Sequence, residues 1–207
     1  MLLNSETPIE ESGDEPAIMF KNSQCPVVIG PNRIQAAKHL MENTDSNVIL
    51  SDDGLQHFSL GRDIEILMID GNRKFGNELL LPAGPLREPK SRIKTVDFTI
   101  SSNRKWPSVA NYEMKYRPFK WVHMKSQKEY DIFDWPLKKE VNAVAGIGNP
   151  SNFFNLLKQL GFDISEYAFP DHHDFHSVDF EIMDNQPTVM TEKDAIKCSF
   201  LDHTNYW

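Results

Sequence analysis

The sequence predicts an α/β fold built on parallel sheets, for three reasons. Short, largely apolar runs, such as residues 48–50 and 64–69, recur along the chain, and such runs are typical of strands covered on both faces of a parallel sheet. Segments with apolar residues at helical spacing alternate with these runs, as they do in β–α–β units. Polar clusters follow several of the runs, where open α/β sheets bind their ligands.

Residues 1–105 are expected to form the first α/β lobe. Residues 1–12 are polar and acidic without a hydrophobic period, which indicates a loop. Residues 32–43 carry apolar side chains on one face and are predicted to form an amphipathic helix. Residues 71–92 are rich in glycine and proline and form a long irregular loop, a kind of segment that is usually functional or disordered. The expected strands of this lobe are residues 26–29, 48–50, 64–69 and 96–100.

The rest of the chain is expected to form a linker and a second, smaller lobe. Residues 106–138 are rich in aromatic side chains and partly alternate in polarity, which predicts a β ribbon joining the lobes. Residues 139–207 return to α/β alternation, and Thr191 and Asp194 have capping-box spacing for a last helix. The other expected elements are strands at residues 141–145, 164–169 and 188–190 and helices at residues 150–160 and 176–184.

The helix expected at residues 150–160 has clear signals at both ends. Asn149 is a suitable N-cap, Pro150 occupies the first helical position, and Gly161 follows the last turn. These signals make it the best-defined helix of the second lobe.

Charge and cysteine content limit the classes of partner. The formal net charge of −8 argues against a nucleic-acid-binding surface. Cys25 and Cys198 lack CxxC spacing, which fits a reducing compartment better than a disulfide scaffold. No apolar run has the length of a membrane-spanning helix, and no signal-peptide pattern opens the chain. We therefore expect a soluble intracellular polypeptide without a nucleic-acid partner, and peripheral membrane contact stays open.

One polar cluster, SDDGLQH at residues 51–57, follows the expected strand 48–50. A carboxylate at the end of a buried strand commonly holds Mg²⁺ against phosphates, because Mg²⁺ takes hard oxygen ligands. An Asp-Gly pair also forms an ordinary turn. Gln56 and His57 beside Asp52 and Asp53 make the cluster more specific than a turn requires.

A second cluster contains Asp171, His172, His173, Asp174 and His176. Histidines beside carboxylates serve as zinc ligands, as a general-base pair, or only as polar surface residues. All three interpretations fit this cluster. The preceding Gly-Ile-Gly at residues 146–148 lacks a third glycine and a lysine, so a tight strand-to-helix turn explains it better than a phosphate loop does.

Two shorter segments also carry charged side chains. Arg87 and Glu88 lie between prolines, and an arginine fork at such a site suits a phosphate group, although a salt bridge within the loop explains the pair equally well. Gly-Asp-Glu-Pro at residues 13–16 reads in isolation as an acidic turn.

Taken together, these motifs resemble the tetraacyldisaccharide 4'-kinase family, the lipid A kinases of Gram-negative bacteria. The resemblance runs from about residue 10 to Trp207 and keeps the order of the motifs. The motifs are GDEP (13–16), SDDGLQH (51–57), LLLPAGPLREP (79–89), AVAGIGNP (143–150), FPDHHDF (169–175) and MTEKDAIK (190–197).

The resemblance implies a P-loop NTPase-like fold and a defined reaction. Members of the family act at the cytoplasmic face of the inner membrane, which they contact peripherally. They use ATP and Mg²⁺ to phosphorylate the 4'-hydroxyl of tetraacyldisaccharide 1-phosphate, a glycolipid, and the product is lipid IVA.

The resemblance also implies roles for individual residues. Asp14 resembles the base that takes the proton from the sugar hydroxyl, and His172 resembles the histidine that pairs with it, with Asp171 beside it. The residues that match positions near the metal ion are Asp52, Asp53 and Glu88. The residues that match positions near the nucleotide are Gln56, His57 and Arg87.

The family's phosphate-binding motif is missing from the sequence. None of the ten glycines is followed by lysine, so the G-x-x-x-x-G-K-[ST] pattern does not occur. In the family this loop precedes the GDEP motif, so we expect an incomplete first sheet and a chain that is a fragment of the kinase. Such a chain should bind ATP weakly, because the loop cradles the β- and γ-phosphates.

Other interpretations of the sequence stay open. The phosphate-loop segment could be a separate polypeptide that binds this chain, as in a split enzyme. From a different functional class, the chain could be a non-catalytic α/β binding module. It could also be a metal-dependent hydrolase that uses Asp52, Asp53, His172 and His173.

Overall fold

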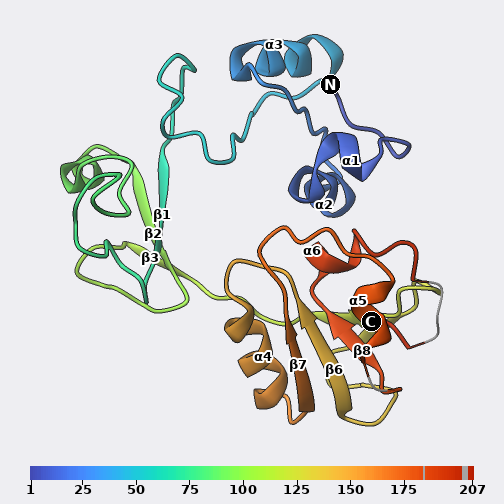
Figure 1. The fold of residues 1–207 in the computed structure, drawn as a ribbon. Helices are drawn as coiled ribbons and strands as arrows, with labels where there is room; N and C mark the ends of the chain where they lie inside the picture. Colours follow the sequence, from blue (N-terminus) through green and yellow to red (C-terminus); the bar gives the residue numbers. More distant parts are fainter. Residues whose placement is uncertain (184, 202–204) are drawn as a thin grey trace. The chain divides into compact units, whose positions relative to one another are not determined.

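The structure is a computed structural model that describes residues 1–183, 185–201 and 205–207. The chain divides into two compact units, and we describe each by itself (Figure 1). The first unit comprises Met1–Pro31, Ala36–Ser46 and Pro118–Trp207, and the second comprises Asn32–Gln35 and Asn47–Arg117.

A three-stranded parallel sheet forms the centre of the first unit. Strand β6 (Glu140–Ala145) lies between β7 (Asp163–Ala168) and β8 (Thr188–Met190). Every residue of β6 after the first is buried, because side chains cover both faces of the central strand. Val141 packs into the hydrophobic cluster on one face and Val144 into the cluster on the other, as the alternation of a strand requires.

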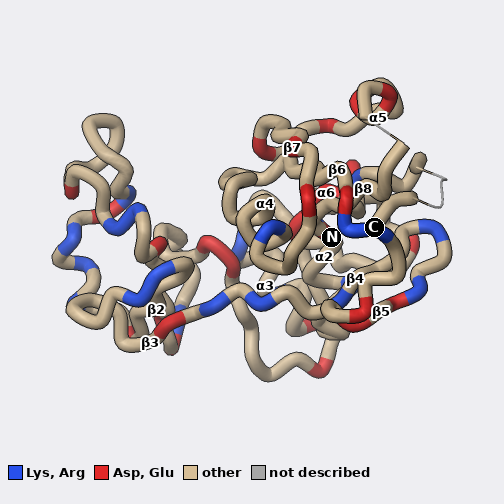
Figure 2. The backbone as a smooth tube through the Cα atoms, turned by 90° about the horizontal axis from the view of Figure 1, so that it is seen from below, with Lys and Arg blue, Asp and Glu red and all other residues tan. Residues whose placement is uncertain are grey.

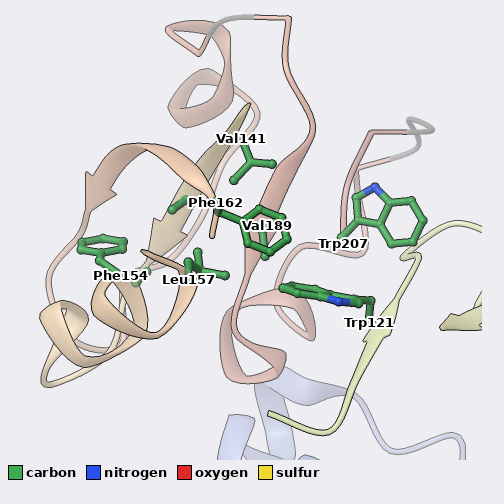
Figure 3. Close-up of a cluster of buried hydrophobic side chains, with 9 residues drawn as sticks. Trp121, Val141, Phe154, Leu157, Phe162, Val189 and Trp207 are labelled. Carbon is green, nitrogen blue, oxygen red and sulfur yellow. The ribbon is translucent and has the colours of Figure 1, made fainter. Parts of the chain in front are cut away.

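Helix α4 (Pro150–Gln159) covers one face of this sheet (Figure 1). Its side chains Phe154 and Leu157 are buried against β6 and β8 (Figure 3). Gly161 follows the helix with a φ of 81°, a left-handed conformation that glycine adopts without a steric penalty. Asn149 occupies the N-cap position as expected, but its side chain makes no capping hydrogen bond within the part of the chain that the structure describes.

An antiparallel ribbon completes the cluster on the α4 face. It consists of β4 (Lys120–Val122) and β5 (Glu129–Asp131). Trp121 of β4 packs against Phe162, and its indole nitrogen donates a hydrogen bond of 2.9 Å to the carbonyl of Ile132. The ribbon therefore belongs to the core of the first unit.

The first unit also contains further helices. They are α1 (Ile9–Ser12), α2 (Asp14–Ser23), α5 (Val178–Glu181) and α6 (Glu192–Ala195). Helix α2 lies beside α6, where the Asn22 side chain donates a hydrogen bond of 3.0 Å to Glu192. No helix within the described residues is long and apolar enough to cross a membrane.

The second unit contains another three-stranded parallel sheet. Strand β2 (Phe98–Ser102) lies between β1 (Ile66–Asp70) and β3 (Tyr112–Met114). The connection from β1 to β2 is the irregular loop that the sequence predicts, and it ends in the 3₁₀ helix η1 (Lys90–Lys94). Within the unit, Phe75 of this loop packs on Trp106 with ring centroids 4.9 Å apart.

The α/β fold with parallel sheets is therefore confirmed, and most expected elements are present. Helix α3 (Arg33–Asn43) matches the helix expected at residues 32–43. The strands expected at residues 64–69, 96–100, 141–145, 164–169 and 188–190 correspond to β1, β2, β6, β7 and β8. Of the helix expected at residues 176–184, the structure shows α5, and residue 184 lies outside the described residues.

Three expectations for the first part of the chain are wrong. Residues 1–12 are not all loop, because α1 occupies the last four of them. Residues 26–29 are not a strand, since Val28 makes only an isolated bridge to Leu2. The expected strand at residues 48–50 is also missing: Val48 is 79% exposed and Leu50 is 89% exposed. An apolar run forms a strand only where a neighbouring strand pairs with it, and no described strand does so here.

Candidate functional site

Asp14 is the first residue of α2 and has a largely buried side chain. Gly13 precedes it with a φ of 81°, which turns the chain from α1 into α2. The Asp14 side chain is 13% exposed, and its Oδ1 accepts a hydrogen bond of 2.9 Å from the backbone N–H of Glu15. A carboxylate in the first turn is favoured by the partial positive charge of a helix N-terminus.

His172 lies in the loop that follows β7 and has an unusual backbone conformation. Its φ of 58° is left-handed, which costs energy for a residue with a Cβ atom. Its backbone N–H donates to the Gly146 carbonyl at 3.2 Å and to Asp171 Oδ1 at 3.1 Å. These bonds hold the conformation and fix where the imidazole leaves the backbone.

The structure brings Asp14 and His172 together. Nδ1 of His172 is 3.2 Å from Oδ2 of Asp14, although the two residues are 158 positions apart in the chain. Asp171 lies beside them, with its Oδ1 4.0 Å from Nε2 of His172.

A lysine that the sequence analysis did not select lies at the same place. Lys193 of α6 has its Nζ 3.1 Å from Glu15 Oε1, 3.7 Å from Asp171 Oδ1 and 4.0 Å from Asp14 Oδ2. The same nitrogen is 3.5 Å from Nε2 of His172. The MTEKDAIK motif contains Lys193, but only the fold shows which distant side chains it meets. We call Asp14, Glu15, Asp171, His172 and Lys193 the Asp14 cluster.

Surrounding charges raise the pKa of the Lys193 ammonium group above its ordinary value. Burial by itself would lower this pKa, because it disfavours the charged form. The hydrogen bond to Glu15 and the charges of Glu15, Asp14 and Asp171 outweigh that effect. Lys193 is therefore charged at neutral pH.

A fully buried carboxylate supports the loops that carry this cluster. Asp194 is 0% exposed, and its Oδ2 accepts hydrogen bonds from the Gly146 N–H at 3.2 Å and from the Thr191 hydroxyl at 2.7 Å. Its Oδ1 faces the ammonium group of Lys197 at 3.6 Å. Asp194 thus ties the loop after β8 to the loop after β6, and the expected cap at Thr191 is confirmed.

A second group of charged side chains lies in the second unit. We call Asp53, Gln56, Arg87, Glu88 and Arg92 the Arg87 cluster. Nη1 of Arg87 donates to Asp53 Oδ1 at 2.6 Å and to Oδ2 at 2.7 Å. Nε2 of Gln56 donates to Glu88 Oε1 at 2.6 Å, and Arg92 Nε donates to Glu88 Oε2 at 3.1 Å.

The Arg87 cluster is anchored near the start of β1. Arg92 also contacts Glu65 at 2.5 Å, and Arg62 contacts Glu65 at 3.1 Å. The hydrogen bond from Arg92 lowers the pKa of the Glu65 carboxyl despite the opposing effect of burial. These ion pairs connect loops that contain few buried apolar side chains.

Two of the sequence-predicted residues stay outside these contacts. Asp52 is exposed, and its carboxylate forms no ion pair with the described residues. The His57 ring is likewise exposed, and His57 takes part in the loop through its backbone, whose carbonyl accepts a hydrogen bond from Arg62 at 2.9 Å. Acidic and basic residues are interspersed in both units (Figure 2).

The described residues only partly fit a metal site. No group of three or more His, Cys, Asp or Glu side chains within residues 1–183, 185–201 and 205–207 is arranged to hold a metal ion. Asp53 and Glu88 are bonded to arginines, so Asp52 is the carboxylate left to bind one. Mg²⁺ is often held by one or two carboxylates together with water and phosphate oxygens, so Asp52 supplies part of such a ligand set.

The two adjacent histidines point to different partners. Nε2 of His173 is 3.0 Å from Asp179 Oδ2, whereas Nδ1 of His172 contacts Asp14. The His173 ring also stacks on Phe169 with centroids 4.7 Å apart. This arrangement argues against a metal site shared by His172 and His173.

Comparison with known proteins identifies the family. The family model described as tetraacyldisaccharide-1-P 4'-kinase matches residues 1–207. The chain is 46% identical over 199 residues to the tetraacyldisaccharide 4'-kinase of Nitrosococcus oceani, covering 94% of this chain and 57% of that protein. It is 48% identical over 188 residues to the Legionella pneumophila (strain Corby) enzyme, covering 90% of this chain and 56% of that protein.

A solved structure is also similar. The crystal structure of LpxK from Aquifex aeolicus in complex with ATP has a TM-score of 0.76 and 29% sequence identity. The match covers 100% of this chain and 67% of that chain. The chain thus spans little more than half the length of the two curated relatives. On the strength of the family model and these relatives, the chain belongs to the tetraacyldisaccharide 4'-kinase family.

Proposed function

We propose that this chain carries part of the active site of a kinase that phosphorylates the 4'-hydroxyl of tetraacyldisaccharide 1-phosphate. ATP is the phosphoryl donor, and the product is lipid IVA, an intermediate of lipid A biosynthesis. The observation that carries the proposal is the contact of 3.2 Å between His172 Nδ1 and Asp14 Oδ2. Family membership and the ATP complex of the Aquifex aeolicus protein support the reaction class and the nucleotide.

Asp14 is the proposed base of the reaction. A sugar hydroxyl is a weak nucleophile, so its proton must leave as the bond to phosphorus forms. That proton moves to the Asp14 carboxylate, while the imidazole of His172 orients the carboxylate through Oδ2. Asp171 holds the His172 backbone through the hydrogen bond of 3.1 Å and so acts indirectly.

The Arg87 cluster is the proposed contact for the phosphates. The Arg87 hydrogen bonds within the described residues all use Nη1, so its Nη2 and Nε N–H groups are left to bind a phosphate oxygen. Gln56 and His57 lie in the loop before β1, which also carries Asp53, and are the other proposed nucleotide contacts.

Mg²⁺ is the proposed metal ion of the reaction. Asp52 is its proposed first ligand, and Asp53 and Glu88 are further candidates once they part from their arginines. When bound, Mg²⁺ neutralises charge on the β- and γ-phosphates.

The 207 residues contain no phosphate-loop motif, since no glycine is followed by lysine. We therefore propose that the chain alone binds ATP weakly and has no appreciable kinase activity. Because the substrate carries acyl chains, the proposed place of action is a membrane surface, reached by peripheral contact at the cytoplasmic face of the inner membrane.

The test uses a chimera in which residues 1–207 replace the matching segment of the Nitrosococcus oceani enzyme. Phosphate transfer from labelled ATP to tetraacyldisaccharide 1-phosphate is measured for the chimera and for its His172→Ala variant. We expect the substitution to lower kcat by about 10²- to 10⁴-fold, the usual contribution of a general base and its partner. His176→Ala is the matched control, because the His176 side chain lies in the same loop and is 67% exposed. Unchanged turnover in the His172→Ala variant would contradict the proposal.

A further inference from the structure

Lys193 is a charged residue enclosed by the Asp14 cluster. Its side chain is 21% exposed, and its Nζ has the carboxylates of Glu15, Asp171 and Asp14 within 4.0 Å. His172 Nε2 is a fourth neighbour, at 3.5 Å. The printed distances make Glu15 and His172 its hydrogen-bond partners, whereas the carboxylates of Asp171 and Asp14 act on the ammonium group through their charge.

Lys193 and Asp14 together favour a proton on Nδ1 of His172. An ammonium group only donates hydrogen bonds, so a ring nitrogen that faces it must present its lone pair. Nε2 is the nitrogen that faces Lys193. In the neutral ring the proton is then on Nδ1, from which it is donated to Asp14 Oδ2 at 3.2 Å.

Lys193 also connects the segments that carry the pair. Asp14 and Glu15 form the first turn of α2, whereas His172 belongs to the loop after β7. Lys193 of α6 contacts both segments, and its bond to Glu15 spans 178 positions of the chain. The last turn of α2 meets α6 separately, through Lys21 and Glu192 at 3.8 Å.

We propose that Lys193 is a positioning residue for the Asp14–His172 pair. It keeps the His172 proton on Nδ1 and holds the first turn of α2 against the loop after β7. The part of this inference that concerns turnover rests on the proposed kinase function, whereas the part that concerns the His172 proton does not.

The primary test is nuclear magnetic resonance of the full 207-residue chain with ¹⁵N-labelled histidine. Long-range ¹H–¹⁵N spectra distinguish a ring nitrogen that carries a proton from one that has a lone pair. The spectra are recorded about two pH units above the ordinary histidine pKa of about 6.5, where imidazole is normally neutral. The resonances of His172 are assigned by their loss in His172→Gln.

Three variants separate the effect of Lys193 from a general loss of charge or fold. Lys193→Met removes the charge and keeps the side-chain length, and Lys193→Arg keeps a cationic donor. Lys21→Met removes a charge from the same α2–α6 contact without touching His172. Backbone amide spectra of β6, β7 and β8 show whether each variant retains the fold.

We expect the Nδ1–H form in the unsubstituted chain, in Lys193→Arg and in Lys21→Met, and a shift toward the Nε2–H form in folded Lys193→Met. A His172 proton on Nε2 in the unsubstituted chain would overturn the proposal. So would a proton that stays on Nδ1 in Lys193→Met. If Lys193→Met does not fold, loss of the Nδ1–H form in folded Lys193→Arg would overturn it as well, since the cationic donor is still present.

The second readout is turnover of the chimera that contains residues 1–207. Lys193→Met should lower kcat by about 10- to 100-fold, a typical cost of displacing a catalytic group, and leave KM for ATP unchanged. Lys193→Arg should recover part of the rate. If the chimera does not phosphorylate the glycolipid at all, the kinase proposal fails, and the spectra still decide the role of Lys193. A raised KM for ATP with unchanged kcat would show that Lys193 binds nucleotide and would overturn the positioning role.

Discussion

Replacement of Asp194 by alanine should strongly destabilise the first unit. Asp194 is 0% exposed and accepts hydrogen bonds from Gly146 and Thr191. Its loss leaves both donors without this acceptor and leaves Lys197, which is 13% exposed, without its carboxylate at 3.6 Å. Lys197 keeps a hydrogen bond of 2.9 Å to the His173 carbonyl, which limits the loss of unfolding free energy.

The expected loss of unfolding free energy follows from these contacts. A hydrogen bond to a charged group contributes about 1.5–3 kcal/mol, and breaking a buried ion pair costs about 3–5 kcal/mol. The contacts share one carboxylate, so their contributions do not add independently. We therefore expect Asp194→Ala to lower the free energy of unfolding by about 3–5 kcal/mol.

The assay is urea denaturation followed by tryptophan fluorescence. Trp121, Trp135 and Trp207 all lie in the first unit, so a Trp106→Phe background removes the signal of the second unit. The control is Asp174→Ala, because the Asp174 side chain is 93% exposed and should matter by less than about 0.5 kcal/mol. A loss below about 1 kcal/mol in Asp194→Ala, with an unchanged m-value, would refute the reasoning.

Three further predictions concern packing, pH and the second cluster. Leu157→Ala should cost about 2–5 kcal/mol of unfolding free energy in the same urea assay, because Leu157 is 1% exposed. Leu156→Ala is the control, since Leu156 is half-buried, and a smaller loss in Leu157→Ala than in Leu156→Ala would contradict the prediction. The backbone hydrogen bond from His176 lowers the pKa of Asp179 in the folded chain below its ordinary value of 3.8. The ionised carboxylate therefore stabilises the fold above pH 3.8. This stability is lost as the pH falls through the lower pKa of the folded state. Asp179→Asn should therefore flatten the fall in urea midpoint between about pH 5 and pH 3, and an unchanged profile would count against it. Arg87→Ala should leave the urea midpoint unchanged, since both side chains of the Arg87–Asp53 pair are more than half exposed. The same substitution should lower kcat of the chimera by about 10²- to 10³-fold. An unchanged kcat would rule out phosphate binding by Arg87.

The elements that the sequence predicted well are those with local signals. Helix α4 has Pro150 at its start and Gly161 after its end, and strand β6 is apolar except for Glu140 and Asn142. The Thr191 cap is defined by residues three positions apart. Such signals act over a few neighbouring residues, so they can be recognised in the sequence without knowledge of the fold.

The elements that the sequence did not predict depend on distant contacts. Helix α2 buries no whole residue, and it meets α6 near the other end of the chain. Residues 48–50 have the composition of a strand, but a strand needs a partner and none of the described strands pairs with them. Lys193 gave no signal because its importance lies in neighbours such as Glu15, 178 positions away.

Two neighbouring residues of α6 act on the Asp14 cluster in separable ways. Parallel strands end at one edge of a sheet, so the loops after β6, β7 and β8 converge there. Asp194 fixes Gly146 of the first loop, and the Gly146 carbonyl in turn accepts the His172 N–H at 3.2 Å. Loss of Asp194 should therefore disturb both the stability of the unit and the place of His172. Loss of the Lys193 charge should instead change which ring nitrogen of His172 carries the proton. It should leave most of the unfolding free energy intact, because Lys193 contacts side chains at this edge of the sheet rather than the backbone that forms it.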